Sequence, residues 1–102
     1  MSFKLIFADE IYNDLQRNIK WYNEKQPGLG TRFYKAVKEQ FPGIKRNPYS
    51  IAIRYEEVRC VKVKGFPYMI HFKIFPGINT VKVIAFFSTS RDPMIWAERT
   101  NK

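Results

Sequence analysis

Residues 68–88 have the sequence YMIHFKIFPGINTVKVIAFFS, and this stretch sets the fold class. Two runs rich in aromatic and β-branched residues, 68–75 and 80–88, flank the segment Pro76-Gly77-Ile78-Asn79. Such runs are typical of strands, and proline, glycine and asparagine are typical of the turn between them. We therefore predict a β-hairpin. The second run is the most hydrophobic of the predicted strands, so we expect it to be central in the sheet.

Three shorter segments upstream of the hairpin also have strand character. Residues 58–64 alternate, with Val61 and Val63 on one side and Lys62 and Lys64 on the other. Residues 51–55 have the same period, and residues 3–7 (FKLIF) are apolar and aromatic.

Between the N-terminal strand and the sheet, the hydrophobic period changes to that of two helices. The first stripe consists of Ile11, Leu15, Ile19 and Tyr22, and the second of Leu29, Phe33, Val37, Phe41 and Ile44. Residues 26–30 (QPGLG) break the pattern between them, which predicts an antiparallel helical hairpin. Pro42-Gly43 predicts an end or a kink in the second helix, and Asp92-Pro93 predicts the start of a short C-terminal helix.

These elements predict one α+β domain over residues 1–102. Its order is an N-terminal strand, the helical hairpin, three or four antiparallel strands in a curved sheet, and a short C-terminal helix. The helix pair is expected to cover one face of the sheet.

The alternation along the strands assigns side chains to the two faces. Val81, Val83, Ala85 and Phe87 are predicted to face the helices, together with Tyr68, Ile70, Phe72 and Ile74. The opposite face is predicted to carry Lys62, Lys64, Met69, His71, Lys73, Lys82, Ile84 and Phe86. Cations mixed with apolar groups indicate a groove for an amphipathic partner segment that carries acidic residues. The terminal helix could also cover part of this face through Trp96.

The charge of the chain supports a polyanionic partner. Eighteen basic and nine acidic residues give a net charge of +9, and no acidic residue occurs between residues 58 and 91. Such a domain favours nucleic acid, an acidic protein surface or anionic lipid, unless the charge only maintains solubility. A plain nucleic-acid-binding module is disfavoured, because the basic face lacks regular aromatic stacking platforms.

The composition also excludes several classes of site. One cysteine and one histidine rule out an intramolecular disulfide, a cysteine-rich zinc site and a two-histidine metal motif, so no metal or cofactor is expected. No apolar run approaches the ~18 residues of a membrane span, and the N-terminus lacks a signal-peptide pattern. We expect a soluble cytoplasmic protein without a membrane partner.

An ordered set of short motifs resembles the RelE/ParE toxin superfamily, in particular its ParE branch. The matching pieces, in order between about residue 8 and residue 99, are Asp14-Leu15, Ile19, Trp21-Tyr22, residues 27–33 (PGLGTRF), Asn47-Pro48, Tyr55, Val58-Arg59, residues 66–70 (FPYMI), residues 90–93 (SRDP), Trp96 and Arg99. The resemblance implies the toxin of a type II toxin–antitoxin pair, which forms a hetero-oligomer with a cognate acidic antitoxin. The mixed face described above is then the predicted antitoxin-binding surface.

The superfamily contains two kinds of toxin, which differ in chemistry. RelE-like members are ribosome-dependent mRNA endonucleases, and ParE-like members inhibit DNA gyrase. Cleavage of RNA requires a proton acceptor, a proton donor and cations around the phosphate. RelE-like proteins place an arginine where this chain has Met69, and ParE-like sequences often have a histidine where it has Ser88. If the chain is a nuclease, its catalytic candidates are Lys62, Lys64, His71 and Arg91.

Because this catalytic set is incomplete, the sequence favours a gyrase inhibitor that acts by binding. The alternative is a ribosome-dependent mRNA endoribonuclease, whose partners are the ribosome and mRNA. The resemblance places the candidate target contacts in the C-terminal segment, at Arg91, Trp96 and Arg99.

Overall fold

The computed structural model describes residues 2–89 of the chain. Its elements in chain order are β1 (Lys4–Phe7), α1 (Ile11–Lys25), α2 (Leu29–Lys38), α3 (Phe41–Arg46), the 3-10 turn η1 (Pro48–Ser50), β2 (Ile53–Tyr55), β3 (Val58–Lys62), β4 (Tyr68–Phe75), the 3-10 turn η2 (Pro76–Ile78) and β5 (Thr80–Ser88). The predicted C-terminal helix lies outside the described residues.

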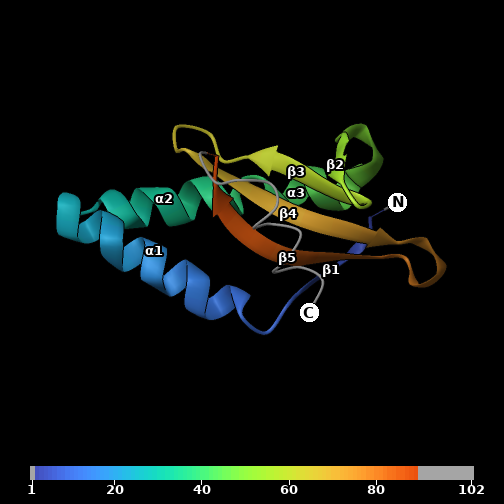
Figure 1. Ribbon diagram of the computed structural model, residues 1–102, viewed down its shortest axis with the longest axis horizontal. Helices are drawn as coiled ribbons and strands as arrows, with labels where there is room; N and C mark the ends of the chain where they lie inside the picture. The colour runs from blue at the N-terminus through green and yellow to red at the C-terminus, as the bar shows by residue number, and fades with distance from the viewer. Residues whose placement is uncertain (1, 90–102) are drawn as a thin grey trace.

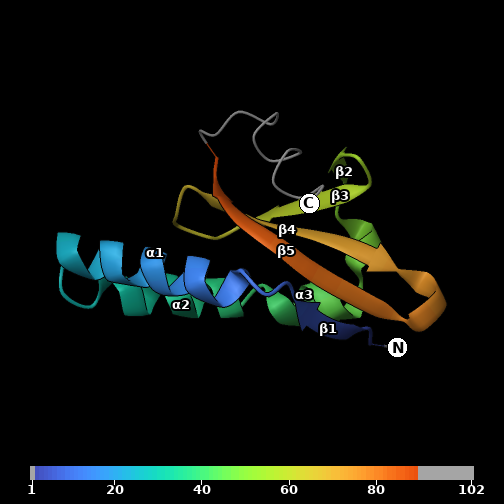
Figure 2. The ribbon, with the colours of Figure 1, turned by 60° about the horizontal axis from the view of Figure 1, so that its bottom comes forward.

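The five strands form one sheet in the order β1-β5-β4-β3-β2. β1 runs parallel to β5, and the other neighbouring pairs are antiparallel. The predicted α+β class and the β4–β5 hairpin are confirmed, and β5 lies inside the sheet between β1 and β4. Figures 1 and 2 show α1 and α2 as an antiparallel pair on one side of the curved sheet.

A close contact at Gly30 joins the two long helices. The Gly30 amide donates a hydrogen bond to Asn23 Oδ1 at 2.8 Å. A Cβ atom at this position would lie 2.2 Å from the carbonyl oxygen of Ile19, so only glycine permits this approach. In the turn, Gly28 has a φ of 85°, a left-handed conformation that suits glycine.

The second helical stripe is interrupted earlier than predicted. α2 ends at Lys38, and a new helix, α3, begins at Phe41. Pro42 therefore lies in the first turn of α3, where its missing amide costs no intrahelical hydrogen bond. The break precedes Pro42-Gly43 because a proline fits the start of a helix better than its interior.

The main core lies between the helices and the sheet. Its buried members are Ile11, Tyr22, Phe33, Val37, Ile44, Val63, Ile70, Phe72, Val81, Val83 and Phe86. Leu15 and Ile19 pack against it from α1. The predicted helix-facing positions Val81 and Val83 are thus confirmed.

A β-bulge in β5 makes part of the predicted face assignment wrong. His71 pairs with Ala85 and Phe72 pairs with Val83, so Ile84 is an extra residue on β5. Beyond such a residue the alternation of side chains is reversed. Phe86 therefore joins the helix-side core, whereas Ala85 and Phe87 form a second cluster, against which Tyr55 and Met69 pack.

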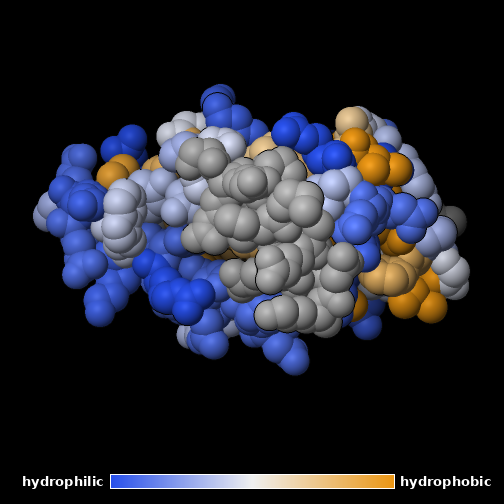
Figure 3. All heavy atoms as spheres, viewed as in Figure 1, coloured by the Kyte–Doolittle hydropathy of each residue, from blue (hydrophilic) through white to orange (hydrophobic). Residues whose placement is uncertain are grey.

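The surface differs between the two ends of the molecule. Figure 3 shows hydrophilic residues over the free end of the helical hairpin and hydrophobic residues at the opposite end, around β2 and the β4–β5 turn. Ile53, Phe75 and Ile78 are exposed there. Among residues 2–89, no helix has the length and hydrophobicity needed to cross a membrane.

Candidate functional site

The predicted cations of the sheet fall into an exposed and a half-buried pair. Lys62 ends β3, Lys64 follows it, and both are exposed. Lys73 on β4 and Lys82 on β5 are half-buried and directly opposite each other in the strand register. Like charges at facing positions repel each other. An anionic group from a partner would relieve this repulsion, so the Lys73–Lys82 pair favours such a partner.

Arg59, near the start of the segment without acidic residues, has a structural role. Its guanidinium donates hydrogen bonds to the carbonyl oxygens of Ile51 at 2.5 Å and Tyr49 at 3.3 Å. It also lies 5.3 Å from the centre of the Tyr49 ring. These contacts tie β3 to the chain that leads into β2.

His71, the only histidine of the chain, is fully buried rather than exposed on a basic face. Its Nδ1 is hydrogen-bonded to the Tyr55 hydroxyl at 2.9 Å and lies 3.4 Å from the sulfur of Cys60. Burial and, to a smaller extent, the positive charge of Arg54 together lower the pKa of His71 from 6.5 to about 4. At neutral pH the ring is therefore uncharged and enclosed by the protein.

Cys60 shares this enclosed environment. Burial raises the pKa of its thiol to about 11, although the Arg54 charge acts in the opposite direction. The thiol is thus protonated at neutral pH and is not an activated nucleophile.

The apolar members of the predicted partner surface also lie deeper than expected. Phe86 is buried under the helices, and Met69 and Ile84 are half-buried. Met69, which stands where RelE-like proteins have an arginine, packs against the cluster of Ala85 and Phe87. Of the predicted surface, the side chains most accessible to a partner are therefore those of Lys62 and Lys64.

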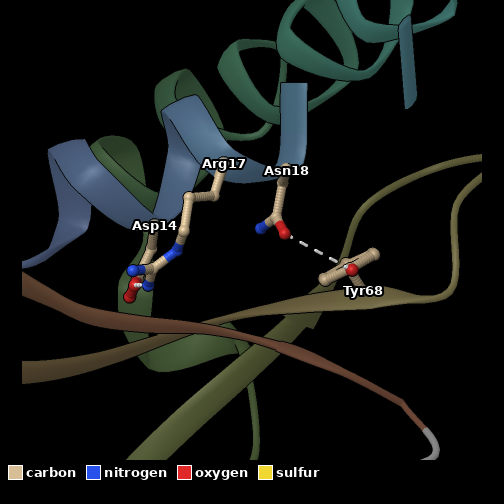
Figure 4. Close-up of polar contacts among 4 residues, drawn as sticks. All are labelled: Asp14, Arg17, Asn18 and Tyr68. Atoms are coloured by element: carbon tan, nitrogen blue, oxygen red, sulfur yellow. Dashed lines mark hydrogen bonds and ion pairs between the residues drawn. The ribbon is translucent and has the colours of Figure 1, made fainter. Parts of the chain in front are cut away.

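A polar cavity of about 120 Å³ lies between α1 and the ends of β4 and β5. Figure 4 shows Asp14, Arg17, Asn18 and Tyr68 around it. Asp14 is buried and forms an ion pair with the exposed Arg17, and the Tyr68 hydroxyl donates to Asn18 Oδ1 at 3.5 Å. Phe86, Phe87 and Ser88 of β5 complete the lining.

Sequence reasoning used Asp14 only as part of a motif and did not predict its burial. The available signal is its position three residues after Ile11, on the side of α1 that faces the core. Its ion pair with Arg17, one turn further along α1, compensates the charge of this buried carboxylate.

Residues 2–89 contain no group of three or more His, Cys, Asp or Glu side chains that could hold a metal ion. Three predicted site residues, Arg91, Trp96 and Arg99, lie outside the described part of the chain.

Sequence comparison finds no match for the chain, either among protein-family models or among curated proteins. Solved structures, in contrast, match over most of its length. The chromosomal ParDE toxin–antitoxin system from P. aeruginosa gives a TM-score of 0.74 at 13% identity, covering 85% of this chain and 96% of that chain.

Two RelBE complexes match in the same way. The RelBE2 complex from Mycobacterium tuberculosis gives a TM-score of 0.64 at 19% identity, covering 86% of this chain and 99% of that one. The intact E. coli RelBE complex gives 0.67 at 14% identity, covering 88% and 100%. The predicted RelE/ParE fold is thus confirmed.

Proposed function

We propose that this chain, which has the RelE/ParE toxin fold, is the toxin of a type II toxin–antitoxin system. It inhibits DNA gyrase by binding, and a cognate acidic antitoxin neutralises it in a hetero-oligomer. The structural neighbours support the first part, since each is named as a toxin–antitoxin system or complex.

The burial of His71 is the observation that favours binding over catalysis. A general acid or base must come within hydrogen-bond reach of the reacting oxygen. A fully buried imidazole with a pKa of about 4 cannot reach an RNA at the surface. The position of the arginine found in RelE-like proteins is taken by Met69, which serves a hydrophobic cluster. A binding mechanism requires neither group.

The charge distribution supports an acidic antitoxin. The net charge is +9, and Lys62, Lys64, Lys73 and Lys82 come from the acid-free segment. A positive potential of this kind steers an acidic partner and makes association sensitive to salt. We propose that the face of the sheet that carries these four lysines contacts the antitoxin.

A ribosome-dependent ribonuclease is the second candidate. The exposed pair Lys62 and Lys64 favours it, because two cations near the end of one strand could stabilise the charge of a cleaved phosphate.

The two functions are separated by parallel assays on one protein preparation. In the first, DNA gyrase supercoils relaxed plasmid in the presence of the free protein. In the second, translating ribosomes are incubated with the protein, and mRNA ends are mapped. We expect loss of supercoiling and intact mRNA. Codon-positioned cuts that disappear in the Lys62→Ala, Lys64→Ala variant, together with unaffected gyrase, would establish the ribonuclease instead.

A further inference from the structure

A row of exposed side chains runs along one side of α1 and consists of Arg17, Trp21 and Lys25. Residues four positions apart are neighbours on the surface of a helix, so the three side chains form a continuous ridge. We call it the α1 ridge. Its central residue, Trp21, is 51% exposed and is the only tryptophan among residues 2–89.

The exposed Trp21 ring is held by two neighbours. The ammonium nitrogen of Lys25 lies over the ring, 4.9 Å from its centre. The ring of Tyr22, which is buried, stands nearly perpendicular to it, at 84° and with centroids 5.0 Å apart. A cation over the face of an indole and an edge-to-face ring pair both stabilise one orientation of the ring. Trp21 is therefore accessible to a partner and already oriented.

Arg17 is also held in place, although its side chain is 74% exposed. One of its terminal nitrogens forms an ion pair with the buried carboxylate of Asp14, one turn earlier on α1 (Figure 4). A guanidinium group has several N–H donors, so a second carboxylate, from a partner, can bind to the same group. The buried Asp14 thus positions an exposed cation beside the tryptophan.

The α1 ridge borders the polar cavity between α1 and the ends of β4 and β5. Arg17 contributes to both the ridge and the lining of this cavity. Ser88, the last residue of β5, lines the cavity as well. The segment that carries the three predicted target contacts follows Ser88 in the sequence. The ridge therefore lies beside the point of the fold from which that segment continues.

The composition of the α1 ridge favours an acidic protein as its partner. Tryptophan and arginine are among the residues that contribute most to protein–protein affinity, and side chains that are already oriented lose little entropy on binding. Between residues 17 and 25 three cations, Arg17, Lys20 and Lys25, accompany one acid, Glu24. The phosphates of a DNA duplex would pair with the cations but would leave the Trp21 ring without an apolar partner.

We propose that the α1 ridge is a surface through which the protein binds DNA gyrase. An apolar side chain of the enzyme covers the Trp21 ring, and carboxylates on either side of it pair with Arg17 and Lys25. The inference rests on the proposed function, in which gyrase is the target. It assigns target binding to a helix and leaves the lysine-bearing face of the sheet to the antitoxin.

The test measures the affinity of full-length variants for immobilised gyrase, together with inhibition of supercoiling. Trp21→Ala should weaken binding at least about thirtyfold, as loss of a central interface residue does. Tyr12→Ala is the matched control. Tyr12 is an aromatic residue of the same helix and is 69% exposed, but nine residues place it about 180° from Trp21 around the helix axis. This variant should bind less than about threefold more weakly than the wild type.

A pair of charge reversals tests the acidic character of the partner without removing the ring. Lys25→Glu should weaken binding at least about tenfold. Lys20→Glu makes the same change in net charge on the same helix, about 140° away around the axis, and should weaken binding less than about threefold. Thermal melts of all four variants, monitored by circular dichroism, show that each is folded at the temperature of the assay.

The possible outcomes separate this proposal from the function on which it rests. If Trp21→Ala binds normally, or if the control variants lose as much affinity as the ridge variants, the ridge is not the contact, while gyrase stays the target. If the wild type neither binds nor inhibits gyrase, both proposals fail. If the ridge variants lose the same affinity for plasmid DNA in the absence of gyrase, the ridge contacts nucleic acid, which would also overturn the proposal.

Discussion

At the scale of single residues, the tight contact at Gly30 is the most demanding position of the helical hairpin. Replacement by alanine places a Cβ atom 2.2 Å from the Ile19 carbonyl oxygen and 2.7 Å from Asn23 Cγ. The helices must move apart, and we expect Gly30→Ala to lower the free energy of unfolding by about 1–3 kcal/mol, as other overpacked sites do.

Gly43 provides the matched control for this prediction. It also lies in a helix, but a Cβ atom there would meet nothing within 4 Å. Gly43→Ala should therefore leave stability unchanged or raise it by up to about 1 kcal/mol, through the better helix propensity of alanine. Urea unfolding measures both variants. Equal stability of the two would show that the close helix contact is absent.

His71 makes the stability of the protein depend on pH. The folded state holds this ring neutral down to a pKa of about 4, whereas an unfolded chain protonates it near 6.5. Between these values the unfolded state binds more protons, so stability falls as the pH is lowered from 6.5 to 4. The loss is on the order of 3 kcal/mol at the lower end, from about 1.4 kcal/mol per pKa unit.

The measurement is the free energy of unfolding of the wild type and of His71→Gln across this pH range. We expect the difference between the two proteins to shrink as the pH falls, because only the wild type loses the contribution of a neutral imidazole. Parallel curves would show that His71 titrates normally and is accessible, which would reopen its role as an acid–base group.

At the scale of elements, the bulge at Ile84 organises the two faces of β5. If Ile84 is an extra residue, its deletion restores regular alternation while Val83, Ala85 and Phe86 keep their faces. We expect this deletion variant to unfold cooperatively in a thermal melt monitored by circular dichroism.

Deletion of Val81 is the control within the same strand. Even if the bulge takes up the missing residue, Lys82 moves to the fully buried position of Val81, where a charged side chain is costly. The expected cost exceeds about 4 kcal/mol. A Val81 deletion that melts at the same temperature as the Ile84 deletion would contradict the assigned register.

The position of this bulge could not be predicted from the sequence. The hydrophobic periodicity predicted the helical hairpin and the β4–β5 hairpin. It also predicted that the side chains of Val81 and Val83 face the helices. It could not predict on which face of the sheet Ala85 and Phe86 lie. Every residue from Val83 to Phe87 is apolar, so the pattern does not show where an extra residue is inserted. The register appears only through pairing with β4, a long-range contact.

The candidate site shows the same limit. The sequence identified the cations Lys62 and Lys64 as exposed, since charged side chains remain in water by default. It placed His71 on the correct face but could not show its burial, which depends on neighbours from other strands such as Tyr55 and Cys60. The sequence also did not indicate the depression lined by Lys4, Lys38 and Lys45, because these residues are far apart in the chain and meet only when β1, α2 and α3 pack together.

At the scale of the whole molecule, the central claim is that the free protein acts by binding and not by turnover. An inhibitor that acts by binding must be present in an amount comparable to that of its target, whereas one enzyme molecule acts on many substrate molecules. The proposal of binding rests on the enclosed His71, which is fully buried and has a pKa of about 4. The number of protein molecules needed to inhibit one gyrase therefore tests this claim.

The most direct measurement is a titration of gyrase supercoiling with the purified protein. The gyrase concentration is kept well above the dissociation constant of the complex. In parallel, the same protein is added to translating ribosomes and the total mRNA is followed. The account predicts that inhibition rises linearly and saturates near one toxin per target site, that an excess of acidic antitoxin reverses it, and that the mRNA remains intact. Undiminished gyrase activity at saturating protein, with mRNA cleaved by far less than one equivalent of protein per transcript, would contradict it.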